Sequence, residues 1–288
     1  MAENSKIEWT HHTFNPWIGC QKVGPGCDHC YAEAWDARGL QQRESRWGPH
    51  ADRTRTSAGN WSKPRAWNKA AAGLAERPRV FCASLADVMD SHHSILPEWR
   101  ADLWALIRAT PNLDWLLLTK RPGNIAKMLP PDWGRGYPNV WLGCTVVNQD
   151  EADRDVPKLL AVPARVRFLS MEPLLGPVDL TRWVGVHPYV GASTYGGSDG
   201  LRRCDLSGNT GLLDWIIVGG ESGPGARAMH PDWALSLLHQ CQAAGVAFHF
   251  KQWGEYAPDL NGIPFWVGKA RAGRLLDGRT WDQMPGEK

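Results

Sequence analysis

The chain has 288 residues, of which 43% are hydrophobic and 22% are charged, and its formal net charge is +2. This length and apolar content exclude a mainly disordered chain and suit one α/β barrel or two medium domains. The near-neutral net charge indicates neither a nucleic-acid nor a membrane partner. The longest aliphatic runs, such as residues 115–118, fall far short of the roughly 18 residues that a membrane span needs. Residues 1–12 contain no apolar signal core, so we expect a cytoplasmic protein.

Seven short apolar runs rich in β-forming residues recur along the chain, and we predict a strand in each. They cover residues 13–20, 79–84, 114–120, 140–147, 166–173, 214–220 and 246–253. Most are nearly continuously apolar, which is typical of strands that are covered on both faces. Because helix-like stretches alternate with them, we predict parallel βα units. We therefore expect an α/β fold, a partial or complete (β/α) barrel of six to seven parallel strands in one domain over 1–288, with an open doubly wound sheet as the alternative.

Three cysteines stand at the end of the first predicted strand, with the spacing C-x6-C-x2-C. A C-x2-C pair lets two thiolates converge on one metal, and the Gly- and Pro-containing loop before it lets a third thiolate join. The spacing alone leaves two interpretations open. One is a structural zinc site completed by a histidine, and the other is a cluster with one iron left open. The cysteines are Cys20, Cys27 and Cys30, and the candidate histidines are His11, His12 and His29.

The other four cysteines read as ordinary positions. Cys82 and Cys144 lie inside apolar runs, and Cys241 shares a helical face with two leucines, so we expect all three to be buried. Cys204 stands alone in a glycine-rich stretch. An odd cysteine count without a secretion signal favours a reducing compartment, in which thiols serve as metal ligands or reactive groups.

Helical periodicity is clearest in two segments, residues 97–110 and 230–245, each of which has a proline near its start. A third segment, 31–40, follows the cysteine loop. Proline is favoured in the first turn of a helix, and Gly245 provides a stop signal for the second segment.

Polar residues follow most of the predicted strands. In a (β/α) barrel, catalytic and binding residues lie at the carboxyl ends of the strands, so we expect these side chains to line a common rim. Taken singly, each is more often a place where the chain meets water. Lys120 and Arg121 either bind a carboxylate or phosphate or balance strand-end acids. The rim residues are Ser84, Asp87, Thr119, Lys120, Arg121, Thr145, Asn148, Ser170, Glu172, Glu221 and Ser222.

Two insertions interrupt the strand rhythm, at about 41–79 and about 185–211. The first carries nine basic and three acidic residues, a local charge of +6, with Trp47, Trp61 and Trp67 interleaved. Cations beside exposed aromatics are typical of nucleic-acid binding, whereas the same tryptophans packed on the barrel would have a structural role. The second insertion is rich in Gly and Ser, and we expect a surface loop.

The three-cysteine loop and the βα pattern resemble the radical S-adenosylmethionine (SAM) superfamily, and most closely its uncharacterised phage-type three-cysteine group. The likeness spans nearly the whole chain and rests on NPWIGCQKVGPGCDHCYAE, LLLTKRP, SMEPLLGP, VGGESGPGARAMHPDW, FKQWGEY and LLDGRTWDQMP. Two features depart from the superfamily pattern. The first cysteine gap is six residues instead of three, and Gly-Gly-Glu follows the sixth predicted strand instead of the second. For the SAM amino group, Asp87 therefore has the better position and Glu221 the better motif.

The resemblance implies a 4Fe–4S cluster on Cys20, Cys27 and Cys30, with SAM on the fourth iron and an electron donor as partner. Reductive cleavage of SAM would give a 5′-deoxyadenosyl radical. We expect the substrate to be a nucleic acid or nucleotide that undergoes base modification or repair. The alternatives are a peptide substrate and a zinc-stabilised nucleic-acid-binding protein without radical chemistry. The expected SAM pocket comprises His29, Tyr31, Ser84, Asp87, Thr119, Lys120, Asn148, Glu172, Gly219, Gly220 and Glu221.

Overall fold

The computed structural model describes residues 3–38, 44–185, 212–259 and 261–286. Contacts divide the chain into two compact units, Met1–Thr145 and Val146–Lys288, which we call the N-unit and the C-unit. The single domain over 1–288 stays a prediction. The predicted insertion at 185–211 lies, apart from its first residue, outside the described residues.

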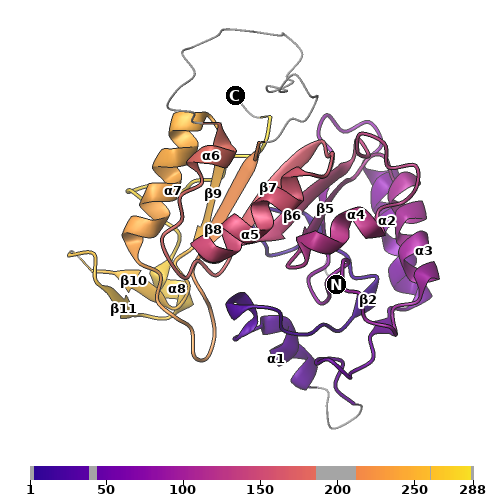
Figure 1. The fold of residues 1–288 in the computed structure, drawn as a ribbon, viewed down its shortest axis with the longest axis horizontal. Coiled ribbons are helices and arrows are strands. Elements are labelled where there is room, and N and C mark those ends of the chain that lie inside the picture. Colours follow the sequence, from indigo (N-terminus) through magenta and orange to yellow (C-terminus); the bar gives the residue numbers. More distant parts are fainter. Residues whose placement is uncertain (1–2, 39–43, 186–211, 260, 287–288) are drawn as a thin grey trace, which may run out of the picture. The chain divides into compact units, whose positions relative to one another are not determined.

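Four parallel strands form the sheet of the N-unit, in the order β1-β4-β5-β6 (Figure 1). The first predicted strand is two short ones, because Pro16 has no amide hydrogen with which to continue the ladder. Its second half, β2, pairs antiparallel with β3. The strands are β1 (His12–Thr13), β2 (Trp17–Ile18), β3 (Thr54–Arg55), β4 (Arg79–Cys82), β5 (Asp114–Thr119) and β6 (Val140–Thr145).

Helices of the N-unit include the predicted helix at 97–110, which is confirmed as α3 with Pro97 in its first turn. Its apolar face buries Leu103, Leu106 and Ile107. The helical elements are η1 (Pro25–Cys27), α1 (Tyr31–Ala37), α2 (Ala58–Ala70), α3 (Pro97–Arg108), η2 (Pro122–Asn124) and α4 (Ile125–Met128).

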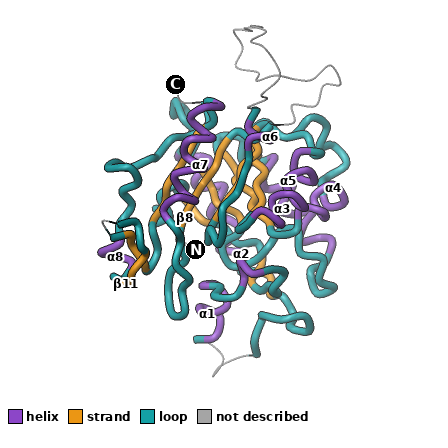
Figure 2. The backbone as a smooth tube through the Cα atoms, turned by 60° about the vertical axis from the view of Figure 1, so that its left-hand side comes forward, coloured by secondary structure: helices purple, strands orange, loops and turns teal. Residues whose placement is uncertain are grey.

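Three further parallel strands, in the order β7-β8-β9, form the sheet of the C-unit. Helix α7 contacts β9, and Figure 2 shows it beside β8. It ends at Gly245, whose φ of 62° is left-handed, so the predicted stop is confirmed. The elements are α5 (Gln149–Leu160), β7 (Val166–Met171), α6 (Thr181–Val184), β8 (Trp215–Gly219), α7 (Pro231–Ala244), β9 (Ala247–Gln252), β10 (Tyr256–Pro258), β11 (Pro264–Trp266) and α8 (Lys269–Ala272).

The α/β class and the predicted number of parallel strands are thus confirmed by the four parallel strands of the N-unit and the three of the C-unit. Cys82, Cys144 and Cys241 are buried as expected, and burial raises the pKa of Cys241 to about 12. Cys204 lies outside the described residues. No helix in the described ranges combines the length and hydropathy that a membrane crossing requires.

A buried histidine lies within the apolar sheet of the C-unit. His249 on β9 is in register with Ile217 on β8 and, through it, with Ser170 on β7, so the three side chains point to one face. The His249 side chain is fully buried, and neither ring nitrogen has a hydrogen-bond partner among the described residues. Burial lowers its pKa to about 4, against a weaker opposing effect of Asp282.

We expect the C-unit to lose stability on acidification because of His249. The unfolded chain takes up a proton at the ordinary pKa of 6.5 and the folded protein only near 4, so stability falls as the pH drops through that interval. The full loss is roughly 3 kcal/mol. Urea unfolding at pH 7 and pH 4 should show it, and His249→Leu should remove most of that dependence. The exposed His239→Leu control should keep it; an equal pH dependence in His249→Leu would exclude this role.

Candidate functional site

The cysteine loop is anchored where β4 ends. Asn15, two residues after β1, donates through Nδ2 to Ser84 Oγ (3.0 Å) and accepts from the Leu85 amide (2.7 Å). The Gly19 amide then donates to the Leu85 carbonyl (3.0 Å). The chain that leads into Cys20 therefore lies against the carboxyl end of β4.

Gly19 is required at the point where this loop turns. Its φ is +118°, and a Cβ there would lie 2.5 Å from the Arg46 carbonyl oxygen and 2.9 Å from Arg53 Cδ. Any other residue would push the segment at 46–53 away from the loop. The loop and the basic segment consequently form one packed structure, which also contains the bridge between Cys20 and Trp47.

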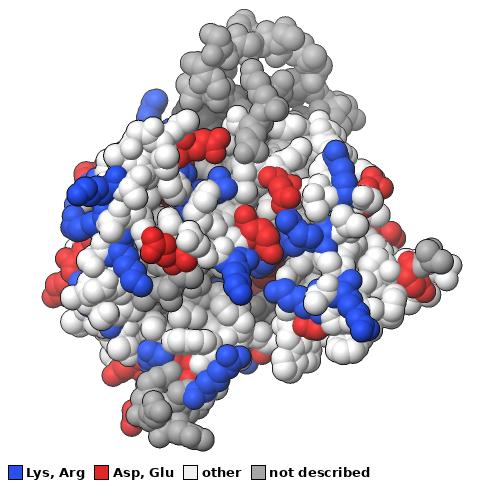
Figure 3. Space-filling view, turned by 180° about the vertical axis from the view of Figure 1, so that it is seen from behind, with Lys and Arg blue, Asp and Glu red and all other residues white. Residues whose placement is uncertain are grey.

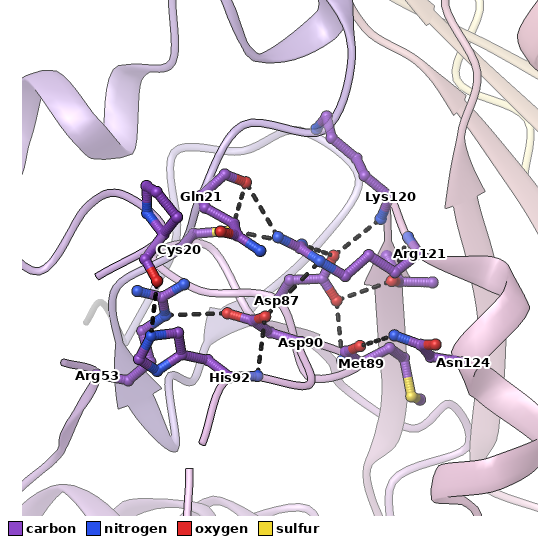
Figure 4. A network of polar contacts seen from close by, with 12 residues as sticks. Cys20, Gln21, Arg53, Asp87, Met89, Asp90, His92, Lys120, Arg121 and Asn124 are labelled. Atoms are coloured by element: carbon purple, nitrogen blue, oxygen red, sulfur yellow. Dashed lines mark hydrogen bonds and ion pairs between the residues drawn. The ribbon is translucent and has the colours of Figure 1, made fainter. Parts of the chain in front are cut away.

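A buried ion pair connects the loop to the next strand end (Figure 4). Arg121, after β5, donates from Nη1 to Cys20 Sγ (3.5 Å) and Asp87 Oδ2 (2.9 Å), and from Nη2 to the Gln21 carbonyl (3.0 Å). Asp87 also accepts from Thr119 Oγ1 (2.7 Å) and from the Lys120 amide (3.0 Å). The guanidinium thus joins the first cysteine to the ends of both β4 and β5.

A second carboxylate lies behind the first. Asp90 accepts from Arg53 Nε (2.9 Å), and the side chains of both residues are almost completely buried. Arg53 also donates from Nη1 to the carbonyls of Gly48 and Ala51. The side chains of Arg121, Asp87, Asp90 and Arg53 therefore form one network of alternating charges beside Cys20, and all four residues belong to the N-unit.

The three loop cysteines differ in exposure: Cys27 is buried, whereas Cys20 and Cys30 are half-buried. Burial raises the pKa of Cys20 to about 11, although the nearby Arg121 guanidinium opposes this. Cys20 is therefore a neutral thiol at pH 7 in the metal-free protein. A metal that binds here must displace a proton, because the thiolate is the ligand.

The three sulfurs are not gathered around one point. Among the described residues, the metal-ligand groups whose ligand atoms all lie within 4.8 Å of one another include no loop cysteine and none of His11, His12 and His29. Thiolates around a tetrahedral zinc with bonds of about 2.3 Å are about 3.8 Å apart. The loop therefore lacks a preformed tetrahedral site for a single ion.

The one compact group found in the described ranges consists of Asp52, His92 and His93. Asp52 and His93 are exposed. Both ring nitrogens of His92 are already hydrogen-bonded, Nδ1 with Ser94 Oγ (2.7 Å) and Nε2 with the Pro49 carbonyl (3.2 Å). Because both His92 nitrogens are engaged and Asp52 and His93 are exposed to water, this group is a poor metal site.

Predicted pocket residues in the N-unit are partly brought together. Asp87, Thr119 and Lys120 form the network above, and the Tyr31 hydroxyl donates to the Ser84 carbonyl (2.6 Å). Three of the predicted rim residues therefore contact one another, and their role in SAM binding stays a prediction. The His29 side chain lies at an exposed position of the cysteine loop.

The predicted pocket residues of the C-unit have local partners. Asn148 caps α5 by accepting from the Glu151 amide (2.9 Å), and Glu172 pairs with Lys251 Nζ (2.5 Å). Glu221 accepts from Arg227 through both oxygens (2.7 and 2.8 Å), which closes its loop.

Gly219 and Gly220, which belong to the expected SAM pocket, lie where a larger side chain would meet neighbouring atoms. A Cβ on Gly219 would lie 3.3 Å from Glu172 Oε2, and one on Gly220 would lie 1.9 Å from the Trp253 carbonyl oxygen. Their assignment to SAM binding stays a prediction.

Most cations of the basic segment at 41–79 have partners within the N-unit. Arg46 pairs with Asp36, Arg53 with Asp90, Arg55 with Asp102 and Arg77 with Asp114. Trp67 is buried and stacks on His12 at 4.3 Å between ring centroids. On the face that Figure 3 draws, basic and acidic side chains are interspersed. The exposed cations of this segment that have no ion-pair partner in the described ranges are those on α2, namely Lys63, Arg65 and Lys69.

Three important residues were absent from the expected SAM pocket. Arg121 was predicted either to bind a carboxylate or phosphate or to balance strand-end acids, and its ion pair with Asp87 matches the second alternative. Asp90 and Lys251 were not considered. Lys251 lies in a strand-end motif, so its position in the sequence could have indicated a site residue. Asp90 lies beyond the strand end, and no sequence pattern indicates its role.

A family model described as Protein of unknown function (DUF5131) matches residues 4–285. Comparisons with curated proteins and with solved structures found no match.

We expect the Arg53–Asp90 pair to fix the basic segment. Arg53→Met leaves Asp90 buried without its main cation, which should lower the free energy of unfolding by about 3–5 kcal/mol. The control Lys63→Met, at an exposed position on α2, should stay within about 0.5 kcal/mol of the wild type. Urea unfolding followed by tryptophan fluorescence measures both. Equal, small effects would mean that Arg53 does not hold the segment.

Proposed function

We propose that this chain, which belongs to the DUF5131 family, is a radical SAM enzyme that holds a 4Fe–4S cluster on Cys20, Cys27 and Cys30. The observation that carries the proposal is the position of the cysteine loop. Hydrogen bonds made by Asn15, Gly19 and Arg121 hold it against the carboxyl ends of parallel strands β4 and β5. The seven parallel strands are compatible with the radical-SAM-like (β/α) barrel, which we include in the proposal.

The donor set fits a cluster better than it fits a single zinc ion. Three thiols in one loop provide ligands for three irons and leave the fourth iron open. A structural zinc ion, in contrast, needs a fourth protein ligand. Among the described residues, no compact group of potential metal ligands includes a loop cysteine, so the cluster assignment rests on the position of the loop and on its number of thiols. Arg121 beside Cys20 adds a positive charge where thiolate charge would accumulate.

When bound, the cluster supplies the electron that cleaves SAM into methionine and a 5′-deoxyadenosyl radical, which abstracts a hydrogen atom from the substrate. Arg121 orients Cys20 and partly offsets its negative charge. Asp87 accepts four hydrogen bonds, from Met89, Thr119, Lys120 and Arg121, so we assign it to the orientation of Lys120 and Arg121. The Lys120 ammonium group has no ion-pair partner in the described ranges, and we assign it to the SAM carboxylate.

The proposed substrate is a nucleic acid or nucleotide that undergoes base modification or repair. Helix α2 supports this class because it contains Lys63, Arg65 and Lys69 and no acidic residue, and its other exposed positions are mostly small. Cations on a smooth surface are suited to phosphate groups. The same helix would serve a zinc-stabilised nucleic-acid-binding protein, so the metal decides between the two functions.

Reconstitution without oxygen should give a brown protein with about four irons. Dithionite should bleach its visible absorbance, and adding SAM should then yield 5′-deoxyadenosine. Each of Cys20→Ala, Cys27→Ala and Cys30→Ala should abolish both iron retention and product, because each removes one of three ligands. The matched control Cys241→Ala should retain both. Iron analysis, visible spectra and chromatography provide the measurements; a colourless protein with one zinc and no iron would favour the nucleic-acid-binding alternative.

Replacing Arg121 should weaken the site without removing a ligand. Arg121→Gln deletes the charge beside Cys20 and leaves Asp87 without its cation, and loss of such a supporting partner lowers metal affinity or activity by about 10- to 100-fold. We expect that loss in cluster retention under chelator challenge and in the rate of 5′-deoxyadenosine formation. The control Arg108→Gln, which breaks the exposed pair with Asp132, should change neither. Wild-type behaviour of Arg121→Gln would remove this residue from the proposal.

A further inference from the structure

The C-unit carries an exposed aromatic hairpin. Strands β10 and β11 pair antiparallel, and α8 contacts β10, so that the three elements lie side by side in Figures 1 and 2. We call residues 256–259 and 261–275 the hairpin surface. Its large apolar side chains are unusually exposed, Trp266 at 67% and Phe265 at 49%, with Ile263 and Leu275 near 60%. Large apolar side chains gathered on one surface usually mark an interaction site.

The strand register places the aromatic rings in a specific way. Tyr256 pairs with Trp266, and Ala257 pairs with Phe265. Paired residues point to the same face of a hairpin and successive residues to opposite faces, so Tyr256 and Trp266 share one face while Phe265 lies on the other. Two neighbouring rings on one face provide a platform on which flat groups can stack.

The first charges that follow Trp266 in the sequence, on and just after helix α8, are positive. Residues 263–275 contain Lys269, Arg271 and Arg274 and no acidic residue. Arg274 pairs with Asp282, whereas Lys269 and Arg271 are exposed and have no ion-pair partner in the described part of the chain. Of the two acids near the hairpin, Glu255 accepts from the amides of Gly223 (2.9 Å) and Lys269 (3.1 Å). Asp259 accepts from the two amides of the hairpin turn.

We propose that the hairpin surface binds single-stranded nucleic acid, with bases stacked on Trp266 and Tyr256 and phosphates held by Lys269 and Arg271. Aromatic rings beside unpaired cations match the two parts of a single strand, the base and the phosphate. A duplex offers no free base faces to such a platform. Aromatic residues and arginine are also enriched at protein interfaces, so a contact between copies of this chain is an outcome that the experiment must separate. The inference goes beyond the proposed function and does not depend on the cluster.

Binding is measured on the full-length chain by fluorescence anisotropy with a labelled oligodeoxythymidine of about 15 nucleotides. Trp266→Ala should lower the affinity for this oligonucleotide by about 5- to 150-fold, because one stacked base is lost. Trp266→Phe should retain most of the affinity, because phenylalanine still stacks. The double variant Lys269→Ala/Arg271→Ala should lower the slope of log K against log salt by about 1.4, since each phosphate contact contributes about 0.7. A duplex of the same length should bind more weakly than the single strand.

Two controls separate this surface from the rest of the chain. Leu74→Ala removes an equally exposed apolar side chain in the N-unit, and Lys127→Ala removes an exposed cation there, so neither should change affinity. Circular dichroism of each variant checks folding, and Phe265→Ala tests the opposite face of the same hairpin. We expect Phe265→Ala to bind nearly as well as the wild type.

Unchanged affinity in both Trp266→Ala and the double variant would overturn the proposal. So would conversion of a dimer to a monomer by Trp266→Ala in analytical ultracentrifugation, which would make the hairpin a contact between copies of this chain. Iron content and 5′-deoxyadenosine formation without nucleic acid should be the same in Trp266→Ala and in the wild type. Failure of the hairpin and failure of the cluster therefore give different results.

Discussion

The N-unit site depends on a buried carboxylate, Asp87. Its two oxygens accept from the backbone of Met89 and Lys120 and from the side chains of Thr119 and Arg121. A buried charge is tolerated only when it is paired and hydrogen-bonded, so these contacts constrain one another. They fix the end of β4 to the end of β5, and through Arg121 they also fix the cysteine loop. Without Asp87, the nearly buried Arg121 guanidinium would lose the carboxylate that lies closest to it.

The charges of this network bear on how the loop could bind a metal group, although Cys20 is protonated without one. Asp87 and Asp90 are balanced by Arg121 and Arg53, so the network has no excess charge of either sign. Thiolates would add negative charge next to Arg121, which already contacts Cys20 Sγ at 3.5 Å. The desolvation that raises the pKa of Cys20 also strengthens this attraction, because charges interact more strongly away from water.

The sequence predicted what local patterns determine. Apolar runs located the seven parallel strands, the proline and glycine signals located α3 and α7, and parallel topology placed Asp87 near Thr119. It did not predict partners that meet only through tertiary packing. Arg53 was counted as part of a basic segment, yet it is buried against Asp90, thirty-seven residues away. Spacing showed that three cysteines share a loop, but it contained no information about the distances between their sulfurs.

Tryptophan shows the same limit most clearly, because its local context is a poor guide to its exposure. Trp67 lies in a cation-rich helix and is buried against His12, whereas Trp266 lies in an ordinary-looking segment and is 67% exposed. The difference arises from what each element packs on. Helix α2 lies against the sheet, so its aromatic residues have a surface to cover. Within the described residues, the two-stranded sheet of β10 and β11 pairs with no third strand, so a ring on its open face stays in solvent unless a ligand covers it. The exposure of Trp266 on this two-stranded sheet is therefore what the proposed stacking of bases requires.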